Sequence, residues 1–151
     1  MSQSTTVRTA IANVLGGIPD IGRVHVYERY ASKASALKAL YVWQGQLRGW
    51  HVRRVRQRRS STTLGRYVVT TRWQIRGFLA LADESQTEQT MDELVDAITA
   101  AFDADEELGG TVDTTVVDNE SGIQLEDSGP YMFAGVLCHG VRLGLNTRHL
   151  E

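Results

Sequence analysis

Hydrophobic and polar residues alternate over one long stretch in the middle of the chain, residues 65–82. Successive side chains of a β-strand point to opposite faces, so a period of two over this length predicts a strand. Residues 49–59 predict a preceding strand, and residues 60–63 predict the hairpin tip between the two. The residues expected on one face of the second strand are Tyr67, Val69, Thr71, Trp73, Ile75, Leu79 and Leu81, and those on the other are Arg66, Val68, Thr70, Arg72, Gln74 and Arg76.

Two other segments carry apolar residues at helical spacing. Residues 5–15 predict a helix that Ser4 or Thr5 caps and that two glycines, Gly16 and Gly17, end. The sequence Ser-Gln-Thr-Glu at residues 85–88 has the form of a capping box and predicts the start of a second helix. The apolar stripe of that second helix consists of Met91, Leu94, Val95, Ile98, Ala101 and Phe102.

The remaining segments predict shorter strands and tight turns. Residues 23–30 and 111–118 predict strands, and residues 131–145 predict the last strand after a turn at residues 127–130. Residues 31–40 fit either a short helix or an extended loop. Strand pairs joined by tight turns, together with two helices, predict an α+β fold: a mostly antiparallel sheet with a long hairpin and two amphipathic helices packed on it.

Length and composition fit a single globular domain. The chain has 151 residues, of which 42% are hydrophobic and 23% charged. We assign residues 1–149 to one α+β domain and set residues 150–151 aside as a candidate tag remnant. No apolar run is long enough for a membrane-spanning helix, and the N-terminus lacks the form of a signal peptide. The single cysteine, Cys138, excludes an intrachain disulfide and fits a reducing compartment.

The sequence contains no recognised motif for catalysis or metal binding. The four histidines include no pair at i, i+4, and there is no Cys-x-x-Cys, phosphate-binding loop or nucleophile elbow. Cys138 and His139 are neighbours in a predicted strand and should point to opposite faces, which disfavours a shared site. The acidic residues 103–107 lack the pattern of a calcium loop and indicate a solvated surface. We expect no catalytic residue, no metal and no cofactor, and therefore a non-enzymatic protein.

Charged residues are segregated along the chain, although the net charge is only −2. Every charged residue from 29 to 82 is basic, and every charged residue from 83 to 127 is acidic. The predicted fold places the basic set on the hairpin and the acidic set on the second helix and the segments after it. The residues predicted to form an oligomer interface are Arg53, Arg54, Arg56, Arg58, Arg66, Arg72 and Arg76 on the basic side, and Glu88, Asp92, Asp96, Asp103, Glu106 and Asp113 on the acidic side.

Three interpretations of this charge pattern are open. The two charged sets can neutralise each other within one monomer. They can join identical subunits head to tail, an arrangement that closes into a ring when the rotation allows. The basic hairpin can instead bind nucleic acid, with Trp50 stacking on a base. Self-association is favoured because arginine suits carboxylate-binding interfaces and because Tyr67 and Trp73 are assigned to the core.

The order of elements resembles that of a known protein family. It comprises an N-terminal helix with Val7-Arg8-Thr9-Ala10-Ile11, a strand, a long basic hairpin, a helix with Met91-Asp92-Glu93-Leu94-Val95-Asp96-Ala97-Ile98, the stretch Leu108-Gly109-Gly110-Thr111-Val112-Asp113 and closing strands. This order resembles bacteriophage tail-completion proteins, including tail terminators similar to minor tail protein U of lambda-like phages.

The resemblance implies a prophage-encoded virion assembly protein without enzyme activity. Such a protein forms a ring, commonly a hexamer, which caps the tail tube, stops its growth and presents a surface for head joining. Its partners would be copies of itself, tail-tube subunits and head-completion proteins. It would reside in the bacterial host cytoplasm during assembly and then in the virion tail.

Overall fold

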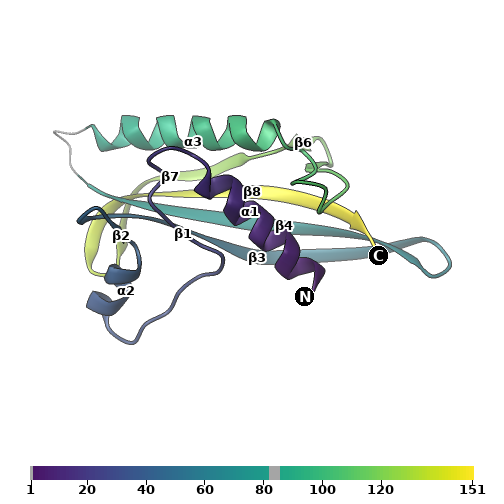
Figure 1. The fold of residues 1–151 in the computed structure, drawn as a ribbon, viewed down its shortest axis with the longest axis horizontal. Coiled ribbons are helices and arrows are strands. Elements are labelled where there is room, and N and C mark those ends of the chain that lie inside the picture. The colour runs from purple at the N-terminus through teal and green to yellow at the C-terminus, as the bar shows by residue number, and fades with distance from the viewer. Residues whose placement is uncertain (1, 82–85) are drawn as a thin grey trace.

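The computed structural model describes residues 2–81 and 86–151, apart from the side chain of Thr62. Three helices and eight strands follow one another in these residues (Figure 1). In chain order the elements are α1 (Gln3–Gly16), β1 (Arg23–His25), α2 (Ala34–Leu40), β2 (Val42–Trp43), β3 (Gln46–Thr63), β4 (Arg66–Ala80), α3 (Thr87–Asp103), β5 (Val116–Val117), β6 (Glu120–Ser121), β7 (Gln124–Phe133) and β8 (Val136–Leu150).

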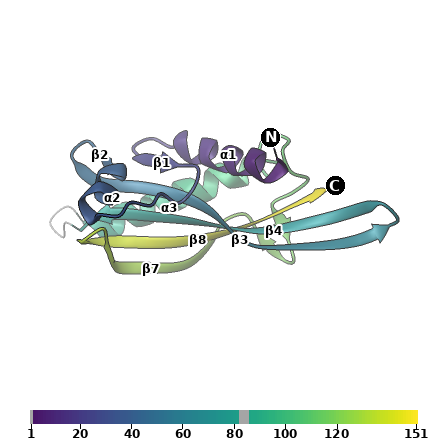
Figure 2. The same cartoon turned by 90° about the horizontal axis from the view of Figure 1, so that it is seen from below.

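The main sheet has the strand order β1-β3-β4-β8-β7, and β2 pairs with the start of β3. All of these pairings are antiparallel except the short parallel pair between β1 and β3. Helices α1 and α3 pack on one face of the sheet, and α2 lies against the other face at one end (Figures 1 and 2). The α+β class, the mostly antiparallel sheet and the long hairpin predicted from the sequence are therefore confirmed.

The main core lies between the sheet and the helices α1 and α3. The apolar stripe of α3 and the alternating apolar residues of β4 meet there, as their spacing requires. Trp50 and Trp73 are the largest buried side chains of this core. The indole Nε1 of Trp50 donates a hydrogen bond to the carbonyl of Ile21 (2.8 Å), which satisfies its polar atom in the interior.

The hairpin of β3 and β4 projects past the rest of the sheet (Figures 1 and 2). Strand β8 follows β4 only as far as the pair Val68↔Leu150, whereas β3 and β4 pair with each other up to Thr63↔Arg66. Beyond His51, the outer edge of β3 has no strand beside it in the described chain. We call residues 54–68, the outer part of this hairpin, the arm.

Helix ends differ in detail from the sequence predictions. Ser2 caps α1, because its side chain accepts a hydrogen bond from the backbone N–H of Thr5 (3.2 Å), so the predicted caps at Ser4 and Thr5 were wrong. Ser85, the first residue of the predicted capping box, lies outside the described residues. Gln86 has φ 53° and makes no side-chain cap bond. The undecided segment before β2 contains the short helix α2.

The two long hairpins turn at positions that the sequence analysis did not predict. The β3–β4 ladder runs through residues 60–63, and the turn lies at Leu64 and Gly65. Gly65 has φ +78°, a conformation that glycine adopts without strain, and Ser and Thr residues continue the strand readily. Residues 127–130 are part of β7 rather than a turn, because Pro130 occupies an edge strand where its missing N–H costs no ladder bond.

The β7–β8 turn lies instead at Ala134 and Gly135, both with positive φ. Tyr131 and Phe133 therefore belong to a different strand from Leu143, contrary to the single strand predicted for residues 131–145. Residues 111–118 also differ from the prediction, because only Val116–Val117 forms a strand there. This segment crosses the end of β8, where the Arg148 carbonyl accepts the backbone N–H of Asp113 (2.8 Å).

Candidate interaction site: a basic arm and an acidic helix

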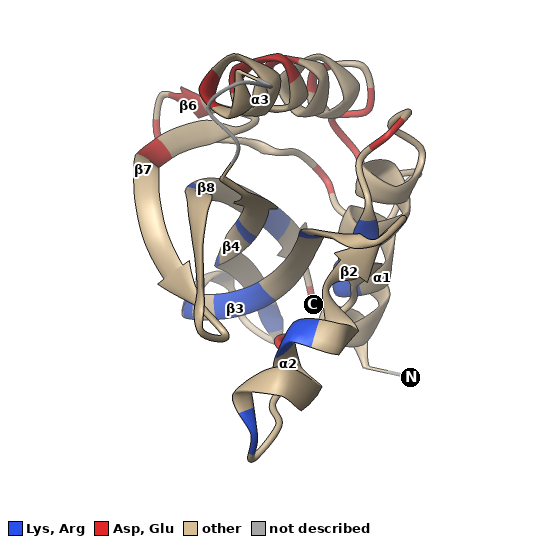
Figure 3. Cartoon of the chain, turned by 90° about the vertical axis from the view of Figure 1, so that its left-hand side faces the viewer, with Lys and Arg blue, Asp and Glu red and all other residues tan. Residues whose placement is uncertain are grey.

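The arm carries a concentrated positive charge. It contains five arginines, Arg54, Arg56, Arg58, Arg59 and Arg66, and no acidic residue. Strand geometry distributes them over both faces of the hairpin, and all five are exposed. Figure 3 shows the same segregation in space: Lys and Arg gather on β3, β4 and α2, whereas Asp and Glu gather on α3 and on the segment around β6.

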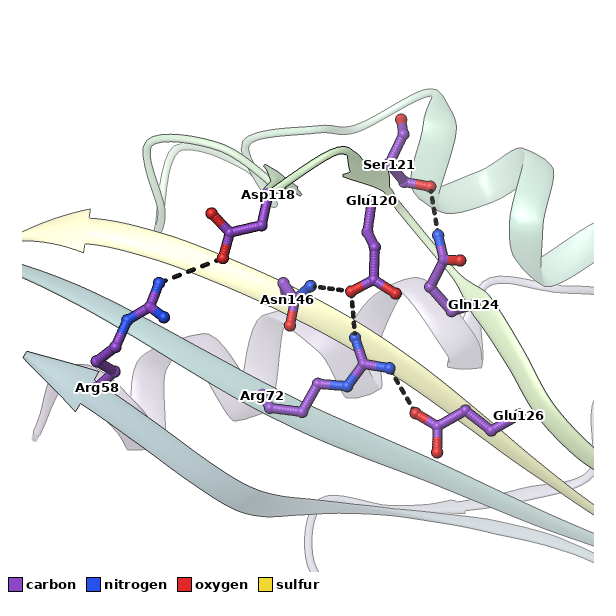
Figure 4. Close-up of polar contacts among 8 residues, drawn as sticks. All are labelled: Arg58, Arg72, Asp118, Glu120, Ser121, Gln124, Glu126 and Asn146. Atoms are coloured by element: carbon purple, nitrogen blue, oxygen red, sulfur yellow. Dashed lines mark hydrogen bonds and ion pairs between the residues drawn. The ribbon is translucent and has the colours of Figure 1, made fainter.

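Arg72, at the base of the arm, is held by two carboxylates of the same chain (Figure 4). Its guanidinium donates to Glu126 Oε1 at 2.5 Å and to Glu120 Oε1 at 3.3 Å. Asn146 Nδ2 donates to the same Glu120 oxygen at 2.8 Å, and Arg142 lies 3.3 Å from the other oxygen of Glu126. Only 18% of the Arg72 side chain is exposed, whereas its carboxylate partners lie closer to the surface.

A second ion pair ties the arm to the segment between β5 and β6. Arg58 Nη2 lies 3.2 Å from Asp118 Oδ2, and both side chains are well exposed. Between this pair and the Arg72 network lies a polar cavity of about 510 Å³, which Arg56 and Thr70 also line. The interpretation that opposite charges neutralise each other within one monomer therefore describes Arg58 and Arg72.

Two further arginines of the predicted basic side have partners in the monomer. Arg53 Nε lies 3.7 Å from Glu28 Oε1. The guanidinium of Arg76 lies over the rings of Tyr131 (4.8 Å) and Phe78 (5.3 Å), which favours a cation.

Three of the predicted arginines, Arg54, Arg56 and Arg66, have no ion pair with any described residue. Each is exposed and lies on the arm. They are thus positioned to meet acidic groups of another molecule. The predicted basic residues therefore form two groups: arginines with a partner in the same monomer, and arginines on the arm without an ion pair to a described residue.

The acidic side is a stripe along the exposed face of α3. Glu88, Asp92 and Asp96 follow one another at intervals of four residues, so they lie on one side of the helix, and all three are exposed. We call these three residues the acidic stripe. The other predicted acidic residues, Asp103, Glu106 and Asp113, follow at the end of α3 and in the loop beyond it, and they are also exposed. None of the six forms an ion pair with a described residue.

Trp73 is buried in the core as predicted, but two other aromatic residues near the arm do not lie where the sequence pattern placed them. Trp50, the residue assigned to base stacking, is 0% exposed and cannot reach a ligand. Tyr67, assigned to the core, is exposed instead, with the Arg59 guanidinium 4.6 Å from its ring centre. The core face of β4 ends at Val69, and Tyr67 lies beyond it, where its backbone pairs with Glu151 after the end of β8. The hypothesis of nucleic-acid binding thereby loses the tryptophan on which it relied.

The cysteine and two of the histidines, the side chains first considered for catalysis, are buried. Cys138 is fully buried and donates to the carbonyl of Tyr131, and burial raises the pKa of its thiol to about 11. His139, its neighbour, points elsewhere and lies 2.8 Å from the hydroxyl of Ser128. His51 is buried beside Tyr41, whose hydroxyl lies 3.0 Å from Nδ1, and burial lowers the pKa of His51 to about 4.

Within residues 2–81 and 86–151, no group of three or more His, Cys, Asp or Glu side chains is arranged to hold a metal ion. In the same residues, no helix has the length and apolar character needed to cross a membrane.

No protein-family model matches the chain, and no curated protein matches it either. Functional inference therefore depends on the side-chain arrangement described above. The sequence pattern did not indicate the carboxylates that pair with Arg58 and Arg72, namely Asp118, Glu120 and Glu126. The feature of the sequence that could have indicated them is their position in an acidic segment around Asn119. The fold places this segment opposite a basic strand.

Proposed function

We propose that this protein is a non-catalytic assembly protein whose copies associate head to tail, the arm of one copy against the acidic stripe of the next. The observation that supports the proposal is the pair of oppositely charged surfaces that remain without partners in the described monomer. Arg54, Arg56 and Arg66 lie on the arm, and the acidic stripe lies on α3. Arginine and carboxylate groups form strong charge-assisted hydrogen bonds when an interface excludes water.

The geometry favours contact between copies over contact within one copy. The tip of the arm projects from one end of the molecule, whereas α3 covers the body of the sheet (Figure 1). Two different surfaces that complement each other form a heterologous interface, which generates a closed ring or an open filament. A ring agrees with the resemblance to phage tail-completion proteins. We accordingly propose that the ring completes or terminates a phage tail tube and joins it to the head.

Light scattering coupled to size-exclusion chromatography tests the association. We expect the parent protein to form a discrete oligomer at low salt, with a mass that falls as salt rises, because salt screens exposed charges. The variant Arg56→Glu/Arg66→Glu should be monomeric at the same concentrations. These two arginines are suitable because neither has an ion pair in the described monomer, so their replacement removes no ion pair within one copy.

The matched control is Lys33→Glu/Lys38→Glu. It makes the same change in net charge with two exposed basic residues of the α2 region, away from the arm. We expect the control to keep the mass of the parent. A parent that is monomeric at every salt concentration would contradict the proposal, as would equal behaviour of the two variants.

A further inference from the structure

A small polar cavity of about 210 Å³ lies between the first turn of α1 and the sheet at the base of the arm. Its floor is formed where the apolar face of the sheet becomes polar. Beyond Trp73 and Leu145, this face carries the buried polar residues Thr71, Thr147 and His149 beside the apolar Val69, and Thr147 Oγ1 accepts a hydrogen bond from the Trp73 indole (3.0 Å). Polar residues at core positions of neighbouring strands indicate that this end of the core contacts polar groups as well as apolar side chains.

His149 is the unexplained member of this floor. The residue is only 7% exposed, and neither ring nitrogen has a hydrogen-bond partner among the described residues. The nearest carboxylate oxygen, Oε1 of Glu151, is 3.9 Å from Nε2, which is beyond hydrogen-bond distance. Buried polar groups without partners are rare in folded proteins because they lose their hydration without compensation. A ligand in the cavity would provide that partner.

The walls of the cavity are positively charged. Arg54 and Arg59 line it from β3, and Arg59 Nη2 lies 3.0 Å from the Glu151 carboxylate. Arg8 lies near this wall without lining the cavity, and burial, followed by the proximity of Arg54, lowers the pKa of its guanidinium. Ser2 and the first turn of α1 form the opposite wall. The first backbone N–H groups of a helix have no partner within the helix and attract anions.

We propose that this cavity binds an oxyanion group, a phosphate or a carboxylate, between Arg54, Arg59, His149 and the N-terminus of α1. The Glu151 carboxylate, which lines the cavity, is itself an oxyanion group, and it forms an ion pair with Arg59 in the isolated chain. The cavity is smaller than the ~300–1,000 Å³ of most small-molecule pockets, so it suits a single group rather than a large ligand. Arg54 belongs to both proposals, but the variants that test the cavity, Arg59→Gln and Glu151→Gln, leave Arg56, Arg66 and the acidic stripe unchanged, so failure of one proposal is distinguishable from failure of the other.

Histidine ring resonances in NMR spectra report directly on the cavity. Inorganic phosphate and acetate would be titrated separately into the protein at constant ionic strength and pH, with chloride as the balancing anion. We expect a saturable shift of the His149 ring signals with phosphate, and with acetate if a carboxylate also fits. His25, His51 and His139 serve as internal controls, because none of them lines this cavity. A phosphate response without an acetate response would assign the site to phosphate groups.

Variants then separate specific binding from general charge effects. Arg59→Gln should weaken phosphate binding about tenfold, the effect of losing one charge-assisted contact. Glu151→Gln should tighten binding, because it removes the competing carboxylate. Arg66→Gln is the matched control, an arm arginine outside the cavity, and should leave the affinity unchanged. The inference would be overturned if the His149 signals fail to saturate with either anion, or if Arg59→Gln and Arg66→Gln change the affinity equally.

Discussion

Replacement of Gly77 by alanine should destabilise the fold through a direct clash with Trp50. Gly77 lies opposite Trp50 in the β3–β4 ladder, and the indole ring crosses over its backbone. An alanine Cβ would lie 2.3 Å from Cζ3, 2.4 Å from Cε3 and 2.6 Å from Cη2 of Trp50. Carbon atoms attract each other best at ~3.5–4.0 Å, so the ring or the strand must move by more than an ångström.

The indole has little freedom to move. Trp50 is 0% exposed, and its Nε1 donates to the Ile21 carbonyl at 2.8 Å. Overpacking a core costs about 1–3 kcal/mol, and losing this hydrogen bond adds about 1 kcal/mol. We therefore expect the free energy of unfolding to fall by about 2–4 kcal/mol. For a domain of this size, that corresponds to a decrease in Tm of roughly 4–16 °C.

Urea unfolding followed by tryptophan fluorescence measures this loss. The matched control is Gly129→Ala, in strand β7, where an added Cβ would meet no atom within 4 Å. The control should keep the stability of the parent within about 0.5 kcal/mol, as most surface substitutions do. Equal stability of the two variants would refute the packing of Trp50 against Gly77, and with it the register that positions the arm.

Three further predictions test other parts of the structure. Because burial lowers the pKa of His51 from 6.5 to about 4, the folded state favours the neutral ring, so the free energy of unfolding should fall as the pH decreases from 6.5 to 4. His51→Leu should flatten that part of the pH profile, and an unchanged slope would contradict the assignment. Cys138, with a pKa of about 11, should resist iodoacetamide near neutral pH until urea unfolds the protein, whereas rapid labelling of the native state would show an open core. Arg72→Met should lower the free energy of unfolding by about 1–3 kcal/mol, since it leaves Glu120 with Asn146 and Glu126 with Arg142 as their remaining partners among the described residues. Arg58→Met removes only an exposed pair and should cost less than about 1 kcal/mol, so equal losses in calorimetry would argue against the Arg72 network.

Periodicity predicted the elements whose packing depends on a repeating pattern. The stripe of α3 and the alternation from Val69 to Ile75 lie in the core as expected, because burial selects apolar residues at each helical or strand repeat. Turns were predicted less well, since composition alone favours residues 127–130 as a turn. The edge position of β7 accommodates Pro130, and edge position is a property of the whole sheet.

The positions of the charged residues were also predicted only in part. Segregation of arginines and acidic residues along the sequence predicted two oppositely charged surfaces, and Figure 3 shows them on different elements. Which arginines remain without partners depended on distant contacts. Arg72 meets Glu120 and Glu126 only because β5, β6 and β7 return beside β4 and β8. No local pattern around Arg72 distinguishes it from Arg66, which stays exposed at the end of the arm.

Mixing two assembly-deficient variants tests the central claim most directly. Arg56→Glu/Arg66→Glu keeps a native acidic stripe, and Asp92→Lys/Asp96→Lys keeps a native arm. Each variant alone should be monomeric, because the charge is reversed on one of the two surfaces that form every interface. If association is head to tail, an equimolar mixture should give a dimer with one copy of each variant, measured by light scattering or native mass spectrometry. A mixture that stays monomeric, while the parent protein forms oligomers, would contradict pairing of the arm with the acidic stripe.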